Sequence, residues 1–144
     1  MIEQDTIKLL RECDAGIKMG IASIEDVQAH AKAQPLRQTL SDSRQAHIHL
    51  QKEVEQLLNK YHDGGKDPNP IAKGMSWMKT NMKLNMEKPD SAIADLMSDG
   101  CHMGVKSLNR YLNQYKAADE TSKDLATRLI HVEDRLAMDV RPYL

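Results

Sequence analysis

The amino-acid sequence predicts an all-α protein, a single helical domain over residues 1–144, and three observations support this prediction. Apolar residues recur every three or four positions through most of the chain, which is the period of a helix with one buried face. Strand-favouring aromatic residues make up only 3% of the chain, whereas Met occurs 9 times and suits helices packed by flexible side chains. A short pattern with paired glycines also occurs twice, at 16–24 and 100–108, and indicates two related helical hairpins.

The bulk composition excludes several classes of function. A chain of 144 residues is long enough for one hydrophobic core. Its net charge of −1 gives no electrostatic basis for binding nucleic acid or an anionic membrane. The first residues lack the pattern of a signal peptide, and 2 cysteines are too few for a disulfide framework. We therefore expect a cytoplasmic protein without nucleic-acid or membrane partners.

The first hairpin is predicted from two long apolar stripes. A helix over about 3–31 is followed by Pro35, which suits the first turn of a second helix over about 35–61. His47 interrupts the second stripe. The stripe of the first helix consists of Leu9, Cys13, Gly16, Gly20, Ile24 and Val27, and that of the second includes Leu36, Leu40, Leu50, Val54 and Leu57.

A loop and a third helix are predicted between the hairpins. The segment 62–69 contains a glycine pair and a proline, which are typical of a loop. Asn69 and Pro70 suit the N-cap and first position of a helix that ends before Pro89. The apolar stripe of this helix consists of Ile71 and four methionines, Met75, Met78, Met82 and Met86.

The second hairpin repeats the stripe of the first. Asp90 or Ser91 is expected to cap a fourth helix, and Asp119 a fifth. With the third helix in the long connection, the order becomes up-down-down-up with a crossover between the second and fourth helices. The fourth stripe consists of Ile93, Met97, Gly100, Gly104, Leu108 and Tyr111, and the fifth of Leu125, Leu129, Val132, Leu136 and Val140.

Two stretches of the chain, 73–82 and 91–104, resemble a family of small, uncharacterised bacterial ferritin-like proteins. The resemblance implies a ferritin-like four-helix bundle. Such bundles hold a di-metal site with a Glu from each of two helices and a Glu-x-x-His from each of the other two. No glutamate here has His three positions later, and no carboxylate is expected at the centre of the four bundle stripes. The di-iron ligands are therefore expected to be missing.

His47 has two interpretations. It is a ligand or proton-transfer group beside the space left by Gly16 and Gly20, or a core histidine bonded to the hydroxyl of Ser23 or Ser43. We favour the core histidine, because buried polar groups usually find a partner within the protein.

The sulfur and glycine residues also leave alternatives open. His47 with Met19, Met103, Cys13 and Cys101 would form a soft-metal site if the side chains converged. The methionine stripe of the third helix is adaptable core or an interface. The four repeated glycines allow close packing of the first and fourth helices, which we favour, or leave a slot for a small ligand. These glycines are Gly16, Gly20, Gly100 and Gly104.

The sequence thus favours a non-catalytic protein that acts by binding or assembly as a homo-oligomer, with no cofactor expected. The methionine-rich third helix is the candidate contact surface, because such surfaces adapt to partners. The alternative is a metal-binding or redox protein that uses His47 with Met and Cys ligands.

Overall fold

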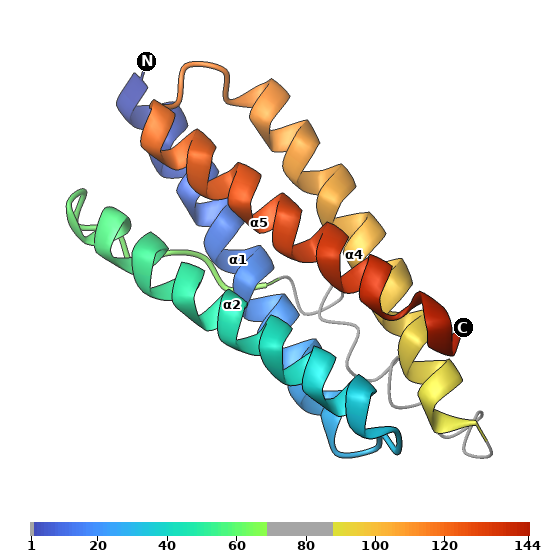
Figure 1. The fold of residues 1–144 in the computed structure, drawn as a ribbon. Helices are drawn as coiled ribbons and strands as arrows, with labels where there is room; N and C mark the ends of the chain where they lie inside the picture. Colours follow the sequence, from blue (N-terminus) through green and yellow to red (C-terminus); the bar gives the residue numbers. More distant parts are fainter. Residues whose placement is uncertain (1, 69–87) are drawn as a thin grey trace.

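The computed structural model describes residues 2–68 and 88–144, which form four α-helices and one short 3-10 turn, with no strand in these two ranges (Figure 1). The all-helical prediction is confirmed for them. The third helix of the sequence analysis lies outside the described residues, together with Met75, Met78, Met82 and Met86. The elements are α1 (Ile2–Gln28), α2 (Gln34–Asn59), α4 (Pro89–Gln114), α5 (Glu120–Asp139) and η1 (Arg141–Tyr143).

The helix starts follow local sequence signals, with one correction. Asp119 caps α5 as expected, since its side chain accepts from the backbone N–H of Ser122 at 2.8 Å. Asp90 does not cap α4, whose N-cap is Lys88. Instead, Asp90 accepts from the backbone N–H groups of Lys32 and Ala33 at 2.7 and 3.0 Å. It therefore joins the start of α4 to the connection between α1 and α2.

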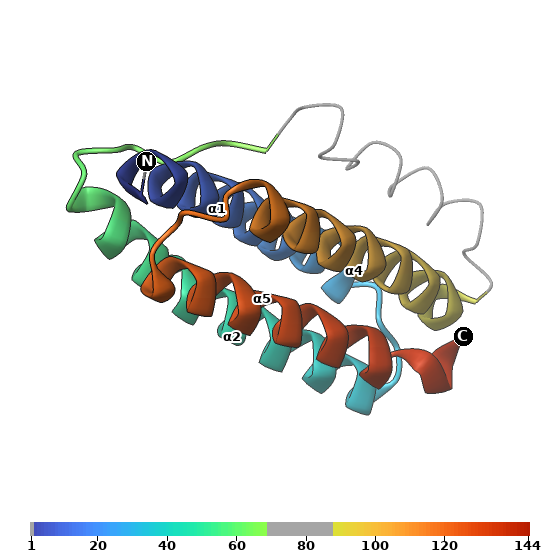
Figure 2. The ribbon, with the colours of Figure 1, turned by 90° about the horizontal axis from the view of Figure 1, so that it is seen from above.

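The four helices pack as two antiparallel hairpins, α1–α2 and α4–α5. Helices α1 and α5 run in one direction and α2 and α4 in the other (Figures 1 and 2). The hairpins meet through contacts of α2 with α5 and of α1 with both α4 and α5. None of the described helices is long and apolar enough to cross a membrane.

The core consists of two apolar clusters stacked along the bundle. One lies toward the α1–α2 connection and includes Ile24, Leu40, Ile93, Met97 and Leu136. The other lies toward the start of α1 and includes Leu9, Ile17, Leu50, Leu108 and Leu129. Between the two clusters each helix contributes one residue to a level that we call the central layer. These residues are Gly20 of α1, His47 of α2, Gly104 of α4 and Glu133 of α5.

The loop after α2 is held against α1 by a buried carboxylate. Asp14 is 2% exposed, and it accepts from the backbone N–H of Lys66 at 3.0 Å and pairs with Lys18 at 2.9 Å. Gly65 has a φ of 83°, in the region that favours glycine, and a Cβ there would collide with Asp14. The loop at 60–68 is therefore packed specifically against α1.

Candidate functional site

The central layer contains a buried ion pair between the two hairpins. His47 Nε2 lies 2.9 Å from Glu133 Oε1, and His47 Nδ1 lies 2.7 Å from the carbonyl oxygen of Ser43. His47 is 1% exposed and Glu133 is 9% exposed. Both ring nitrogens of His47 thus have partners inside the protein. The expected partner was a hydroxyl of Ser23 or Ser43, but the structure provides a carbonyl and a carboxylate instead.

Both nitrogens of the ring face acceptors. A carbonyl oxygen only accepts, so Nδ1 must carry a proton to bond Ser43. An ionised carboxylate also only accepts, so Nε2 must carry a proton to bond Glu133. The arrangement is therefore fully satisfied by an imidazolium beside a carboxylate, which is a net neutral pair.

Two of the repeated glycines make room for this pair. A Cβ at position 20 would lie 2.6 Å from His47 Nε2 and 2.7 Å from His47 Cδ2. A Cβ at position 104 would lie 3.4 Å from Glu133 Oε2. Gly104 of the second repeat therefore leaves space for the carboxylate of Glu133, as Gly20 of the first repeat leaves space for the imidazole of His47. These glycines accommodate side chains of α2 and α5.

The other two repeated glycines lie elsewhere. Gly16 and Gly100 are exposed. A Cβ at Gly16 would touch only Leu129 of α5, at 3.9 Å, and one at Gly100 would meet nothing within 4 Å. The expected seam of four glycines between α1 and α4 is therefore wrong, because Gly20 and Gly104 meet side chains of α2 and α5 and neither Gly16 nor Gly100 meets the other helix.

Cys101 lies at the edge of the central layer. Burial raises the pKa of its thiol, and the charge of Glu133 and a hydrogen bond to Glu133 raise this pKa further. Burial also raises the pKa of the Cys13 thiol to about 12, with the charges of Glu12 and Asp14 adding to the effect. Both thiols are held protonated, which is unfavourable for a nucleophile.

The environment of His47 acts on its pKa in two directions. Burial lowers the pKa, because it disfavours the charged form. The hydrogen bond and charge of Glu133, together with the Ser43 carbonyl, raise it and outweigh burial. The pKa of His47 is therefore raised above its ordinary value of 6.5.

The predicted soft-metal set is dispersed. Cys13 belongs to the cluster near the start of α1, and Met103 is 70% exposed. Met19 is half-buried beside Gly20. Within residues 2–68 and 88–144, no group of three or more His, Cys, Asp and Glu side chains is arranged to hold a metal ion.

Glu133 is the site residue that sequence reasoning missed. The expectation that no carboxylate occupies the centre of a stripe is wrong, because α5 buries Glu133. Leu129 and Leu136 lie four positions before and three positions after it, and both are buried. That spacing places all three on one helix face, and it was the available signal.

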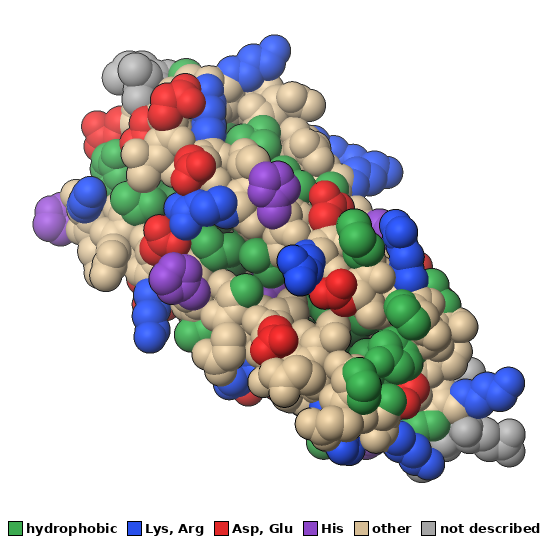
Figure 3. Space-filling view, in the orientation of Figure 1, with side chains coloured by type: hydrophobic (Ala, Val, Ile, Leu, Met, Phe, Trp, Pro, Cys, Tyr) green, Lys and Arg blue, Asp and Glu red, His purple; other side chains and the backbone are tan. Residues whose placement is uncertain are grey.

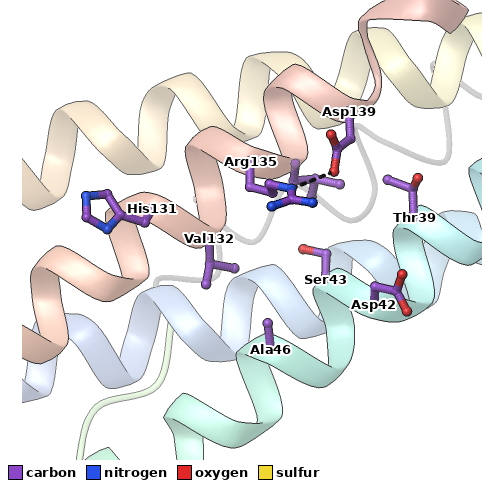
Figure 4. Close-up of a pocket in the computed structure, with 9 residues that line it drawn as sticks. Thr39, Asp42, Ser43, Ala46, His131, Val132, Arg135 and Asp139 are labelled. Atoms are coloured by element: carbon purple, nitrogen blue, oxygen red, sulfur yellow. Dashed lines mark hydrogen bonds and ion pairs between the residues drawn. The ribbon is translucent and has the colours of Figure 1, made fainter.

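A groove lies between α2 and α5 (Figure 4). It has a volume of about 430 Å³, and Ser43, Val132 and Leu136 are among its lining residues. Arg135 and Asp139 form an ion pair of 3.3 Å at its rim. The hydroxyl of Ser43 is buried and has no hydrogen-bond partner in the described part of the chain. Side chains of both charges surround this face of the bundle (Figure 3).

Comparisons with protein-family models, with curated proteins and with solved structures give no match to this chain.

Proposed function

We propose that this chain is a ferritin-like bundle that acts by binding or assembly, and that the His47–Glu133 pair fills the place where such bundles hold metal. Helices α2 and α4 run in the same direction, which favours the long crossover of the ferritin-like arrangement. Ferritin-like metal ligands project inward from all four helices at one level. The central layer is such a level, and two of its four positions are glycine.

This proposal rests on the observation that both ring nitrogens of His47 have hydrogen-bond partners within the chain. A histidine that binds a metal needs a ring nitrogen with a free lone pair, and its other nitrogen usually donates to the protein. Both nitrogens of His47 are instead directed at acceptors of the chain, at 2.7 and 2.9 Å. The pair supports the packing of the two hairpins without any added group.

Assembly is the second part of the proposal. We propose a cytoplasmic homo-oligomer whose contact surface is the methionine stripe, Met75, Met78, Met82 and Met86, which lies outside the described residues. Thioether side chains adapt to a partner surface. The two cysteines are free and buried, which is usual in a reducing compartment.

Elemental analysis of protein purified without a tag tests the first part. We expect well under one iron, copper or zinc ion per chain. A stoichiometric metal that is lost in His47→Ala and kept in His131→Ala, a variant of an exposed histidine, would overturn the proposal.

Light scattering on a Met78→Lys, Met82→Lys variant tests the second part. If the stripe is an interface, the variant stays helical and its mass falls to that of one chain. Met138→Lys, on α5 at a residue 55% exposed, is the matched control and should keep the mass of the parent. A double variant that unfolds, or that keeps the parent mass, would reject the stripe as the interface.

A metal-binding or redox protein is the second candidate, and one observation favours it. Glu133 bonds the imidazole of His47 and interacts with the thiol of Cys101, although within the described residues these side chains are not arranged as a group that could hold a metal ion. These are ligand types that transition metals use. Binding would require both the ring and the thiol to lose protons. Stoichiometric metal that is lost in Glu133→Gln as well as in His47→Ala would establish this candidate.

A further inference from the structure

The hydrogen bonds of the His47–Glu133 pair depend on how many protons the imidazole ring carries. The imidazolium satisfies both acceptors, Ser43 O and Glu133 Oε1, at 2.7 and 2.9 Å. A neutral ring has one N–H only. If that N–H points to Glu133, the lone pair of Nδ1 faces the Ser43 carbonyl, and the reverse tautomer directs a lone pair at the carboxylate. Loss of one proton therefore leaves two acceptors in contact, in either tautomer.

We propose that the His47–Glu133 pair is a pH-dependent clamp between the two helical hairpins, which holds while His47 is protonated and loosens when His47 loses a proton. The two residues come from α2 and α5, one from each hairpin. They lie at the level between the two apolar clusters, against Gly20 of α1 and Gly104 of α4, whose missing side chains leave room for the pair. This inference does not depend on the proposed function.

The described groups near the pair do not replace the positive charge that His47 loses on deprotonation. Gly20 of α1 and Gly104 of α4 lie against the pair and carry no charge. Cys101 of α4 carries a protonated thiol, and α2 contributes the carbonyl of Ser43. Glu133 is the charged side chain that acts on His47 among the described residues. Deprotonation of His47 therefore turns a neutral buried pair into a lone buried carboxylate, which is strongly unfavourable.

The groove between α2 and α5 shares Ser43 with the surroundings of the pair, but neither His47 nor Glu133 lines it. Ser43 lines the groove with its side chain and holds His47 with its carbonyl (Figure 4). Val132 and Leu136, on either side of Glu133 in the sequence, line the same groove.

The direction of the pH effect follows from the raised pKa of His47. The stabilisation from the pair is complete below about pH 6.5, the ordinary pKa of histidine, and it is lost as pH rises through the folded-state pKa. Within that window the folding equilibrium constant falls by up to about tenfold for each pH unit.

Two measurements on the intact protein test the clamp. The first follows the imidazole resonances of His47 by NMR from about pH 5 to about pH 10, and we expect a midpoint above the ordinary value of 6.5. The second measures urea unfolding at each pH. We expect stability to fall across the window in the parent and in His131→Gln, an exposed histidine on the same helix as Glu133. The fall should be smaller in His47→Gln, where the buried thiols of Cys13 and Cys101, which ionise in the unfolded chain above about pH 8.5, still lower stability.

Two outcomes would overturn the clamp. One is a His47 midpoint at or below the ordinary histidine value, and the other is a pH dependence of unfolding that is the same in His47→Gln as in the parent. If His47→Gln does not fold, the NMR titration of the parent and of Glu133→Gln decides, because the clamp requires the midpoint to drop when the carboxylate becomes an amide. An unchanged midpoint in Glu133→Gln would reject the pairing.

Discussion

Gly20 lies against the imidazole ring of His47, so closely that a Cβ at position 20 would come within 2.6 Å of Nε2. A glycine inside a helix costs about 1 kcal/mol relative to alanine. Here the absent side chain provides the space in which a histidine of α2 reaches a glutamate of α5. Two glycines of the repeated pattern, Gly20 and Gly104, therefore make room for the core pair.

Substitution of this glycine tests the contact directly. We expect Gly20→Ala to lower the free energy of unfolding by about 1–3 kcal/mol, because the new methyl group displaces the His47 ring from its two partners. Gly100→Ala is the matched control, since position 100 is exposed and a Cβ there meets nothing within 4 Å. It should raise stability by up to about 1 kcal/mol through helix propensity. Urea unfolding measures both, and equal effects of the two substitutions would contradict the contact.

The loop on α1 offers a second glycine comparison. Gly65→Ala should destabilise the fold by at least about 1 kcal/mol, because an alanine is strained at a φ of 83° and its Cβ collides with Asp14. Gly64→Ala should change stability little, since a Cβ at Gly64 has open space around it. Thermal or urea unfolding of both variants checks this prediction. A loss of stability at position 64 as large as that at position 65 would show that the loop is not held as described.

The two cysteines should react only when the protein opens. Burial raises the pKa of both thiols, to about 12 for Cys13, so a thiolate forms poorly in the native state. We expect a thiol reagent to modify native protein slowly, at a rate set by unfolding, and to modify urea-unfolded protein at once. Cys13→Ala and Cys101→Ala separate the two sites. Rapid modification of either thiol in the native protein would contradict its burial.

Sequence reasoning identified the features that depend on local chemistry. The α5 cap at Asp119 follows from its own helix start, and the burial of His47 follows from its place in an apolar stripe. Glu133 was missed, and Asp90 was expected as a helix cap, because their partners are far away in the sequence. Glu133 bonds His47 on another helix, and Asp90 bonds the backbone of Lys32 and Ala33. A carboxylate on a helix is usually solvated, so its pattern alone gives little sign of a buried partner.

The neighbours of the repeated glycines could not be predicted from the sequence either. Their spacing predicts that the two hairpins are related, but the atoms that each glycine meets depend on how every helix is rotated about its axis. A small rotation decides that Gly20 faces α2 while Gly16 is exposed. The stripe fixes a face to within about a hundred degrees, which is too coarse to choose between these neighbours.

The central claim is that His47 and Glu133 form one buried pair that closes the core, and a double-mutant cycle tests it most directly. Unfolding free energies of His47→Leu, Glu133→Leu and the combined variant are measured by urea denaturation at a pH below about 6.5, where the pair is complete. We predict that each single variant costs about 3–5 kcal/mol, because it leaves a buried charge without a partner, and that the combined variant lies close to the parent. A combined loss equal to the sum of the two single losses would contradict the pair.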